Sequence, residues 1–555
     1  MGYNKLIMRP FWVLLTRKQH SLGSAAVTLM SMVIISGLLG LIRHRILYDH
    51  FSPSETGIYF AAFRLPNLIF ELLAMGSLTA AFIPVFTKFI AHGSTQDADK
   101  MAATVINISI ILSVVVSIPI YVWTDVFSKL MAPGFTFEQI GQMSSYTRFM
   151  LVFQVLPLII GNFFTGILQS YSYFLIPAFA PIIYNIGIIA GILLFSSTFG
   201  LFSAVIGVGI GAFLFLLVQI PAIILTGYKH SWHVNIKIPG VSEVGRLIAP
   251  RMIGIGVSQI DLTIDLVLSS LLGPKMVTIF FLAQNLQQLP VRLFGSTIAQ
   301  AALPTLSSAS AKEDRVQFKN SIVTASHMIL FLVLPASVFF IVLRIPIVRL
   351  VYGAARFDWE ATVLTALTLS WFSLSLFAQA LSQVFTRGFY ALYDSRTPVA
   401  VGFATILLNS LLSLFFIVSL GLPIWCLAVS TTIASIINML FLFMLLARKI
   451  AGFSFQAVII KPLKIITATF IMGIVIYVPM KLFDQLVFDT TRVFGLVTLT
   501  GIVAIIGLGT YLFLAWVMDI GEVRSFGILL AKIRKLRESL IQPTSDIVSG
   551  DPATP

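Results

Sequence analysis

The chain has 555 residues, of which 58% are hydrophobic and only 10% are charged. A soluble chain carries charge at roughly a quarter of its positions, so the composition excludes a soluble globular protein and indicates a surface that faces lipid. The net charge of +14 indicates basic loops on one side of a membrane, because the sequence has no basic stripe with interleaved aromatic residues that would bind nucleic acid.

Apolar segments long enough to cross a bilayer follow one another along the chain with short breaks. A helix needs roughly 20 apolar residues to cross about 30 Å of hydrocarbon. We therefore predict an all-α polytopic membrane protein with about 14 transmembrane helices. The predicted spans lie near residues 24–48, 57–91, 102–126, 141–170, 174–197, 201–226, 242–272, 276–307, 319–351, 360–391, 397–419, 423–447, 462–483 and 494–518.

The distribution of lysine and arginine predicts the orientation of these spans. Basic residues are frequent in the connections after even-numbered spans and rare in the others, so the positive-inside rule places both termini in the cytoplasm. Residues 1–22 are interpreted as a cytoplasmic N-terminal tail. Residues 521–555 are a second cytoplasmic tail, first basic and then polar and proline-rich, a composition typical of disorder.

A weak internal repeat divides the predicted helices. The dipeptide Phe-Thr at 164–165 recurs at 385–386, and Pro177 recurs as Pro398, both after about 220 residues. Six spans fit between equivalent points, which predicts parallel repeats that face each other across a central cavity. The predicted parts are an N-lobe at 23–228 (spans 1–6), a C-lobe at 229–450 (spans 7–12), and two further spans within 451–520.

Ionisable residues inside the predicted spans are the candidates for function, because each costs roughly 2.5–3.5 kcal/mol at the centre of a bilayer on insertion scales. Apart from Arg344, which we interpret as interfacial, the candidates come from the first two spans of each predicted lobe: Arg43, Arg64, Glu71, Arg251, Asp261, Asp265 and Arg292. Arg64, Asn67 and Glu71 share one helix face, and Asp261 and Asp265 are one turn apart. We expect a cationic site for an anionic head group, with the two aspartates as candidates for ion coupling. The alternative is a purely structural ion pair, such as Arg64 with Glu71.

The sequence contains no catalytic or ATP-binding motif, so we expect a transporter rather than an enzyme. We expect no cofactor and no metal centre, apart from a coupling cation or the membrane potential as the energy source. Cys426 is the single cysteine, which leaves no intrachain disulfide. The spacing of Gly187 with Gly191 and of Gly207 with Gly211 indicates close helix packing.

Several stretches resemble the MurJ/MviN family of lipid II flippases, in the expected order from about residue 24 to 450. They are SGLLGLIRH (36–44), FRLPNLIFELLAMGSLTAAFIPVF (63–86), FLIPAFAPIIYN (174–185), VSQIDLTIDLVLSSLL (257–272), AQNLQQLPVRLFGSTIAQAALPTLS (283–307) and RGFYALYDSRTPV (387–399).

The resemblance implies the fold of the multidrug/oligosaccharidyl-lipid/polysaccharide exporters, with helices 13 and 14 lining a groove for a lipid tail. It also implies a bacterial cytoplasmic (inner) membrane and a flippase for undecaprenyl-pyrophosphate-linked peptidoglycan precursor. Membrane lipids are implied partners, and cell-wall synthesis proteins are possible ones. Gln259 and Asn285, which lie in matching stretches, join the candidate substrate-binding residues.

The sequence departs from the family pattern at several usual site positions. Gly37 and Phe70 replace arginines, Gly57 and Met75 replace acids, and Asn285 replaces the arginine of the eighth helix. Two further interpretations therefore stay open. One is a transporter of the same fold for another lipid-linked saccharide or amphiphile, and the other is a membrane scaffold for envelope synthesis that transports nothing.

Overall fold

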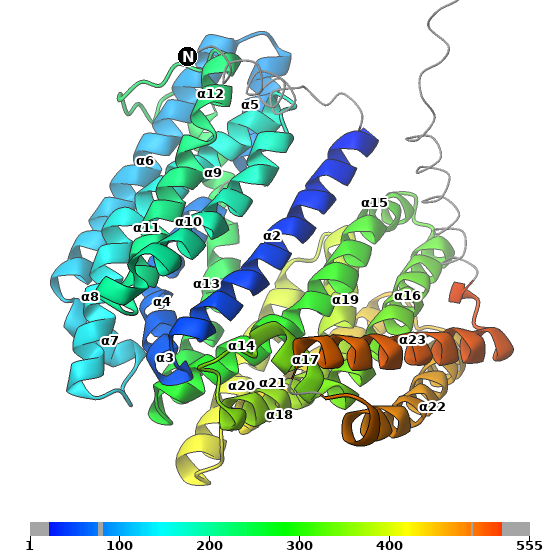
Figure 1. The fold of residues 1–555 in the computed structure, drawn as a ribbon. Coiled ribbons are helices and arrows are strands. Elements are labelled where there is room, and N and C mark those ends of the chain that lie inside the picture. Colours follow the sequence, from blue (N-terminus) through cyan, green and yellow to red (C-terminus); the bar gives the residue numbers. More distant parts are fainter. Residues whose placement is uncertain (1–21, 76–80, 239, 490–491, 524–555) are drawn as a thin grey trace, which may run out of the picture. The chain divides into compact units, whose positions relative to one another are not determined.

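The computed structural model describes residues 22–75, 81–238, 240–489 and 492–523, and these residues form helices joined by short connections (Figure 1). Side chains are described over the same ranges except at residues 22–30, 75, 249–251, 253, 257 and 457. The predicted tails at 1–22 and 521–555 fall almost entirely outside these ranges.

The helices (α) and short π-helical segments (η) alternate along the chain. The first part contains α2 (Leu22–His50), α3 (Pro53–Ala62), α4 (Arg64–Phe70), η1 (Glu71–Met75), α5 (Ile83–Ala91), α6 (Thr95–Val122), α7 (Thr124–Met131), α8 (Phe137–Phe153), α9 (Val155–Ser170), α10 (Leu175–Phe199), α11 (Phe202–Leu217) and α12 (Ile220–Thr226).

The second part contains α13 (Val241–Leu271), α14 (Pro274–Pro290), η3 (Val291–Ser296), α15 (Thr297–Ala311), α16 (Arg315–Val342), α17 (Arg344–Tyr352), α18 (Trp359–Ser373), α19 (Leu376–Ala391), α20 (Arg396–Leu414), η4 (Phe415–Ser419), α21 (Trp425–Lys449), η5 (Gln456–Ile460), α22 (Lys461–Leu482), η6 (Phe483–Val487) and α23 (Val493–Val517).

The all-α membrane fold is confirmed. Within the described residues, 12 helical stretches are long and apolar enough to cross a membrane, or 13 if the bent pair α18 and α19 is one span. The predicted span at 276–307 is also helical, as α14, η3 and α15, but it is not among the 13. Its glutamines and Arg292 lower its mean hydropathy, which is the pattern expected of a helix that faces polar surroundings.

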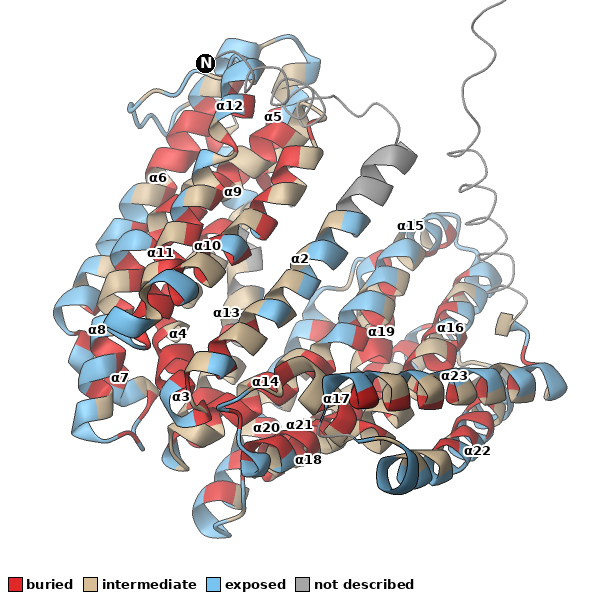
Figure 2. Ribbon diagram, in the orientation of Figure 1, coloured by how far each residue is buried: buried red, intermediate tan, exposed pale blue. Residues whose placement is uncertain are grey.

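The surface of the spanning helices is apolar. In the second half of α6, Val115, Ile118 and Val122 are 57%, 56% and 58% exposed, whereas Met101 and Ile106 in its first half are buried. Figure 2 shows both buried and exposed residues along this helix. Many other large apolar side chains of the spanning helices are also exposed. Such a surface is stable only where lipid replaces water.

The chain divides into two compact units that are discontinuous in sequence. Unit 1 comprises residues 1–286, 345–372 and 402–434, and unit 2 comprises 287–344, 373–401 and 435–555. The two six-helix lobes inferred from the repeat stay a prediction.

Four glycines allow α10 and α11 to pack with their backbones in contact, as their spacing predicted. A Cβ built on Gly187 would overlap the Cα of Gly211, and a Cβ built on Gly191 would overlap the Cα of Gly207. Helix pairs in lipid gain stability from such close van der Waals packing, because lipid supplies no hydrophobic driving force between them.

Replacing Gly191 with alanine is therefore expected to push α10 and α11 apart and to destabilise the protein by about 1–3 kcal/mol. The measurement is the temperature at which the monodisperse fraction of detergent-solubilised protein falls by half. Gly141→Ala is the matched control, since a Cβ on Gly141 of α8 meets nothing within 4 Å. Equal melting temperatures for the two variants would contradict the packing role.

Asp394 links two residues of unit 2, one near the start of α20 and one at the end of α21. Its carboxylate accepts hydrogen bonds from the backbone N–H and hydroxyl of Thr397 at 3.0 and 2.8 Å, and from the Lys449 ammonium at 2.7 Å. The bond from Lys449, together with those from Thr397, lowers the pKa of Asp394 to about 2. The contact lies between spans, near the start of α20 and the end of α21.

Asp394→Asn is expected to lower the free energy of unfolding by about 1 kcal/mol at pH 7. Because the folded-state pKa lies below the unfolded value of about 3.9, the charge stabilises the fold at higher pH and stops doing so as pH falls from about 5 toward about 2. The melting-temperature difference between wild type and variant should thus be smaller at pH 3 than at pH 7. Asp97→Asn, which breaks only an exposed 3.8 Å pair with Lys100, should change the melting temperature little at either pH.

Candidate functional site

The regular hydrogen bonding of the second predicted span is interrupted at one residue, just before its polar stripe. Helix α3 ends at Ala62, Phe63 separates it from α4, and α4 begins at Arg64. Pro66 occupies the first turn of α4, where its missing N–H leaves no hydrogen bond unmade. Phe63 keeps helical backbone angles and Pro53–Ala74 forms one apolar stretch long enough to span a membrane, so Arg64 lies within this span, directly after the interruption.

The hydrogen bonds of Arg64 go to α13. Its Nε and Nη2 donate to the hydroxyl oxygen of Thr263 at 2.9 and 2.8 Å, and Nη2 also donates to the backbone carbonyl of Gln259. The Thr263 hydroxyl in turn donates to the same carbonyl at 2.8 Å. Residues about 200 positions apart in sequence thus share one polar contact, and Arg64 uses its donors there rather than on Glu71.

The acidic residues of α13 lie beside this contact in sequence and differ in their surroundings. Asp261 accepts a hydrogen bond from Asn409 of α20 at 3.0 Å. Asp265, one turn later, is only 3% exposed, and its Oδ1 has no hydrogen-bond partner among the described residues. The side-chain oxygen of Gln259 is buried without a partner in the same sense. Buried acceptors of this kind are costly unless a proton, a cation or a donor satisfies them.

Asn67 contacts a residue that the sequence-based reasoning did not select. Its side-chain oxygen accepts a hydrogen bond at 3.3 Å from Gln154, which lies between α8 and α9 and is 1% exposed. Gln154 could have been found from the sequence because it is the one polar residue between Phe149 and Ile160, where a polar group needs a reason.

Arg43 is held by a different helix. Its Nη1 donates to the side-chain oxygen of Asn185 on α10 at 3.1 Å, and its Nη2 lies 3.1 Å from Nε2 of His44. Asn185 also donates to the carbonyl of Pro181 at 3.0 Å. Asn185 and His44 are buried polar residues in apolar helices, and that pattern is again the signal by which sequence alone could have selected them.

The remaining candidates are more scattered. Asn285 is half-buried on α14 within unit 1, and Glu71 is half-buried at the start of η1. Arg292 is exposed in η3, donates to the Gln288 side chain, and belongs to unit 2. The side chain of Arg251 lies outside the described part of the chain. Unit 1 therefore contains the candidates from Arg43 to Asn285.

Two glycines bring other parts of unit 1 into backbone contact with the turn between α13 and α14. A Cβ on Gly57 of α3 would overlap the carbonyl of Pro274, and a Cβ on Gly134, between α7 and α8, would overlap the carbonyl of Ser270. Thr278 of α14 reinforces the contact by donating to the carbonyl of Pro53 at 2.7 Å. No side chain intervenes at either glycine.

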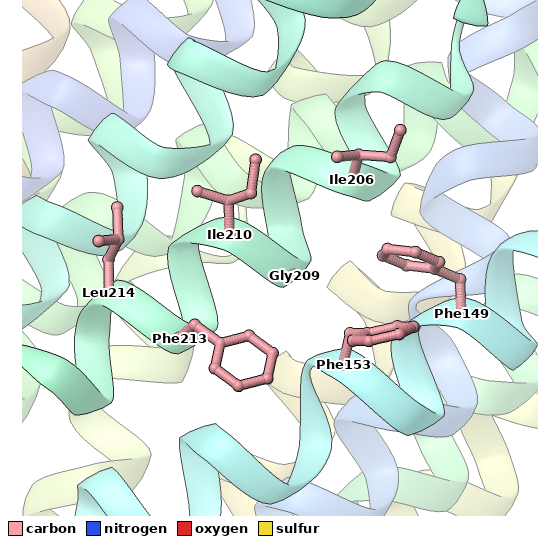
Figure 3. Close-up of a pocket in the computed structure, with 7 residues that line it drawn as sticks. All are labelled: Phe149, Phe153, Ile206, Gly209, Ile210, Phe213 and Leu214. Atoms are coloured by element: carbon pink, nitrogen blue, oxygen red, sulfur yellow. The ribbon is translucent and has the colours of Figure 1, made fainter.

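A separate pocket of about 280 Å³ lies between α8 and α11 (Figure 3). It is lined by Phe149, Phe153, Ile206, Gly209, Ile210, Phe213 and Leu214. The lining has no polar side chain, so this pocket suits hydrocarbon and cannot hold a charged head group. It contains none of the candidate residues.

The chain matches the family model described as "Lipid II flippase MurJ" over residues 51–519. It is 26% identical to the probable lipid II flippase MurJ of Buchnera aphidicola subsp. Acyrthosiphon pisum, over 81% of this chain and 89% of that protein. It is also 26% identical to the lipid II flippase MurJ of Burkholderia cenocepacia, over 77% of this chain and 84% of that protein.

Solved structures show the same fold. The chain matches a structure of "Lipid II flippase MurJ, inward closed conformation" with a TM-score of 0.72 and 23% identity, over 89% of this chain and 98% of that one. An inward-facing multidrug resistance MATE family transporter matches with a TM-score of 0.62 and 16% identity, over 77% and 98% of the two chains. Because the family model covers most of the chain, the protein belongs to the MurJ family of lipid II flippases.

Proposed function

We propose that this protein moves lipid II, the undecaprenyl-pyrophosphate-linked peptidoglycan precursor, across the bacterial cytoplasmic membrane by alternating access. The observation that carries the proposal is the Arg64 contact within a chain of this family, because it holds a cation at a defined place in a membrane-spanning bundle. Both termini are cytoplasmic in the proposed orientation.

The chemistry of the head group fits arginine. A pyrophosphate offers several anionic oxygens, and a guanidinium binds such oxygens through short, charge-assisted hydrogen bonds. We assign Arg64 and Arg43 as its main cationic contacts, with Arg251 and Arg292 as further ones. Asn67, Glu71, Gln259 and Asn285 would supply polar contacts to the rest of the head group, while the polyprenyl tail stays in lipid or in a groove along α22 and α23.

The contacts at Gly57 and Gly134 support the proposal that the transport path is closed at its extracytoplasmic end. In the proposed orientation, the connections between α2 and α3, α7 and α8, and α13 and α14 all lie on the extracytoplasmic side. The contacts at Gly57 and Gly134 join the predicted N-lobe to the first helices of the predicted C-lobe there. A contact made mainly by backbone atoms at two glycines forms and separates with little side-chain reordering, which suits a gate that opens in each transport cycle.

We assign Asp261 and Asp265 to ion coupling. The buried oxygen of Asp265 that lacks a partner and the Asn409 contact of Asp261 supply acceptors for a cation or a proton, and the membrane potential would drive its movement. No other cofactor is needed, and cell-wall synthesis proteins are the proposed protein partners.

A transporter of another lipid-linked saccharide is the second candidate. It is favoured by the replacement of usual family residues by Gly37, Gly57, Phe70, Met75 and Asn285, which removes charges from the expected site. Competition between lipids separates the two candidates.

Arg64→Ala is expected to weaken lipid II binding about 10-fold or more, because hydrogen bonds from a charged group contribute about 1.5–3 kcal/mol. The measurement is lipid II binding to protein in nanodiscs, with undecaprenyl phosphate and an ordinary anionic lipid as competitors. Arg492→Ala, which removes an exposed arginine that pairs with Asp489 at the surface, is the control and should bind as wild type does.

Equal and weak binding of all three lipids by the wild-type protein would reject lipid II as the substrate. Selective binding that Arg64→Ala leaves unchanged would keep the substrate and reject the site.

Gly57→Ala is expected to open the outer end, because the added Cβ would overlap the Pro274 carbonyl. The measurement uses a Cys426→Ser background with Ser270→Cys, a buried position whose hydroxyl donates within its own helix and whose carbonyl meets Gly134, and a membrane-impermeant thiol reagent added to cells. Labelling should rise several-fold with Gly57→Ala and stay low with Gly141→Ala, and monodispersity on size exclusion verifies folding. A folded Gly57→Ala variant that labels no faster than the control would show that this contact is not the closure.

A further inference from the structure

The hydroxyl of Thr263 lies at the centre of the Arg64 contact. It accepts from both Nε and Nη2 of Arg64, at 2.9 and 2.8 Å, and it donates to the carbonyl of Gln259 at 2.8 Å. Donation to the carbonyl four residues earlier is a common arrangement for threonine within a helix. It fixes the direction of the hydroxyl hydrogen, so the lone pairs are turned toward the arginine.

This arrangement divides the donors of the guanidinium into two sets. Arginine has five N–H donors in a rigid plane. The Nε hydrogen and the two Nη2 hydrogens are engaged by Thr263 and the Gln259 carbonyl. Among the described residues, no protein group accepts a hydrogen bond from Nη1 of Arg64, so Nη1 is the end of the fork to consider for a ligand.

We propose that Thr263 is a positioning residue for substrate: it holds the Nε–Nη2 edge of Arg64 against α13, so that Nη1 meets a phosphate oxygen of the lipid head group. The inference rests on the proposed function for the identity of that anion. Thr263 itself does not touch the substrate.

The pre-set orientation matters because a free arginine has many rotamers, and fixing them on binding would cost affinity. Serine keeps the hydroxyl that accepts from Arg64 and donates to the Gln259 carbonyl, and it lacks only the methyl group. Valine has the same shape without the acceptor. The three residues therefore separate shape from hydrogen bonding at one position.

The test is binding of lipid II and of undecaprenyl pyrophosphate to full-length protein in nanodiscs. We expect Thr263→Val to raise both dissociation constants about 3- to 10-fold, with Thr263→Ser close to wild type. In an Arg64→Gln background, Thr263→Val should have no further effect, because the group that it positions is gone. Thr368→Val is the matched control, since Thr368 is a buried threonine that also donates to the carbonyl four residues earlier, that of Leu364, at 2.7 Å.

Each outcome decides the assignment. Unchanged affinity in a Thr263→Val protein with wild-type melting temperature overturns the positioning role and leaves the flippase proposal standing. An equal loss in the wild-type and Arg64→Gln backgrounds also overturns it, because the effect would then be structural. Threonine-dependent binding of undecaprenyl pyrophosphate without selective binding of lipid II keeps the positioning role and rejects lipid II. Binding of neither lipid by wild type rejects both.

Discussion

The need to satisfy a cation inside a membrane-spanning bundle is the constraint on which the site depends. In a low-dielectric interior, a guanidinium is tolerable only where acceptors are already fixed around it. Arg64 finds two of them on α13, one a side-chain hydroxyl and one a backbone carbonyl. Neither acceptor is charged, so the arginine keeps its net positive charge for an anion, which an ion pair with Glu71 would have reduced.

Glycines, which have no side chain, are found where segments of this protein approach most closely. Glycines of α10 and α11 allow backbone contact within one predicted lobe, and Gly57 and Gly134 allow it between parts that alternating access would separate. The physical basis is shared, but the consequence differs. The contact between α10 and α11 runs along two long helices, which suits a permanent contact. The proposed gate at Gly57 and Gly134 is short and is reinforced by few hydrogen bonds, such as that of Thr278.

One departure from the family pattern, glycine at position 57, is explained by the contact of Gly57 with the Pro274 carbonyl. An acidic side chain at position 57 could not fit against the Pro274 carbonyl in this conformation, so glycine there is compatible with the tight closure. Phe70 and Asn285 have no such explanation in the structure. The retained arginine at 64 donates hydrogen bonds to two residues of α13. Of these, Gln259 was predictable from the sequence and Thr263 was not.

The sequence alone determined that the chain spans the membrane many times, that its polar residues cluster in particular helices, and that glycine spacing sets the packing of α10 and α11. These properties follow from the composition and residue spacing of each segment, because the bilayer constrains every spanning segment separately. Tertiary structure decided the partners: Thr263 for Arg64, Asn185 for Arg43, Gln154 for Asn67 and Asn409 for Asp261. The physical reason is that a hydrogen bond between helices far apart in sequence depends on their relative rotation and approach, and one apolar helix can pack against many others at similar free energy.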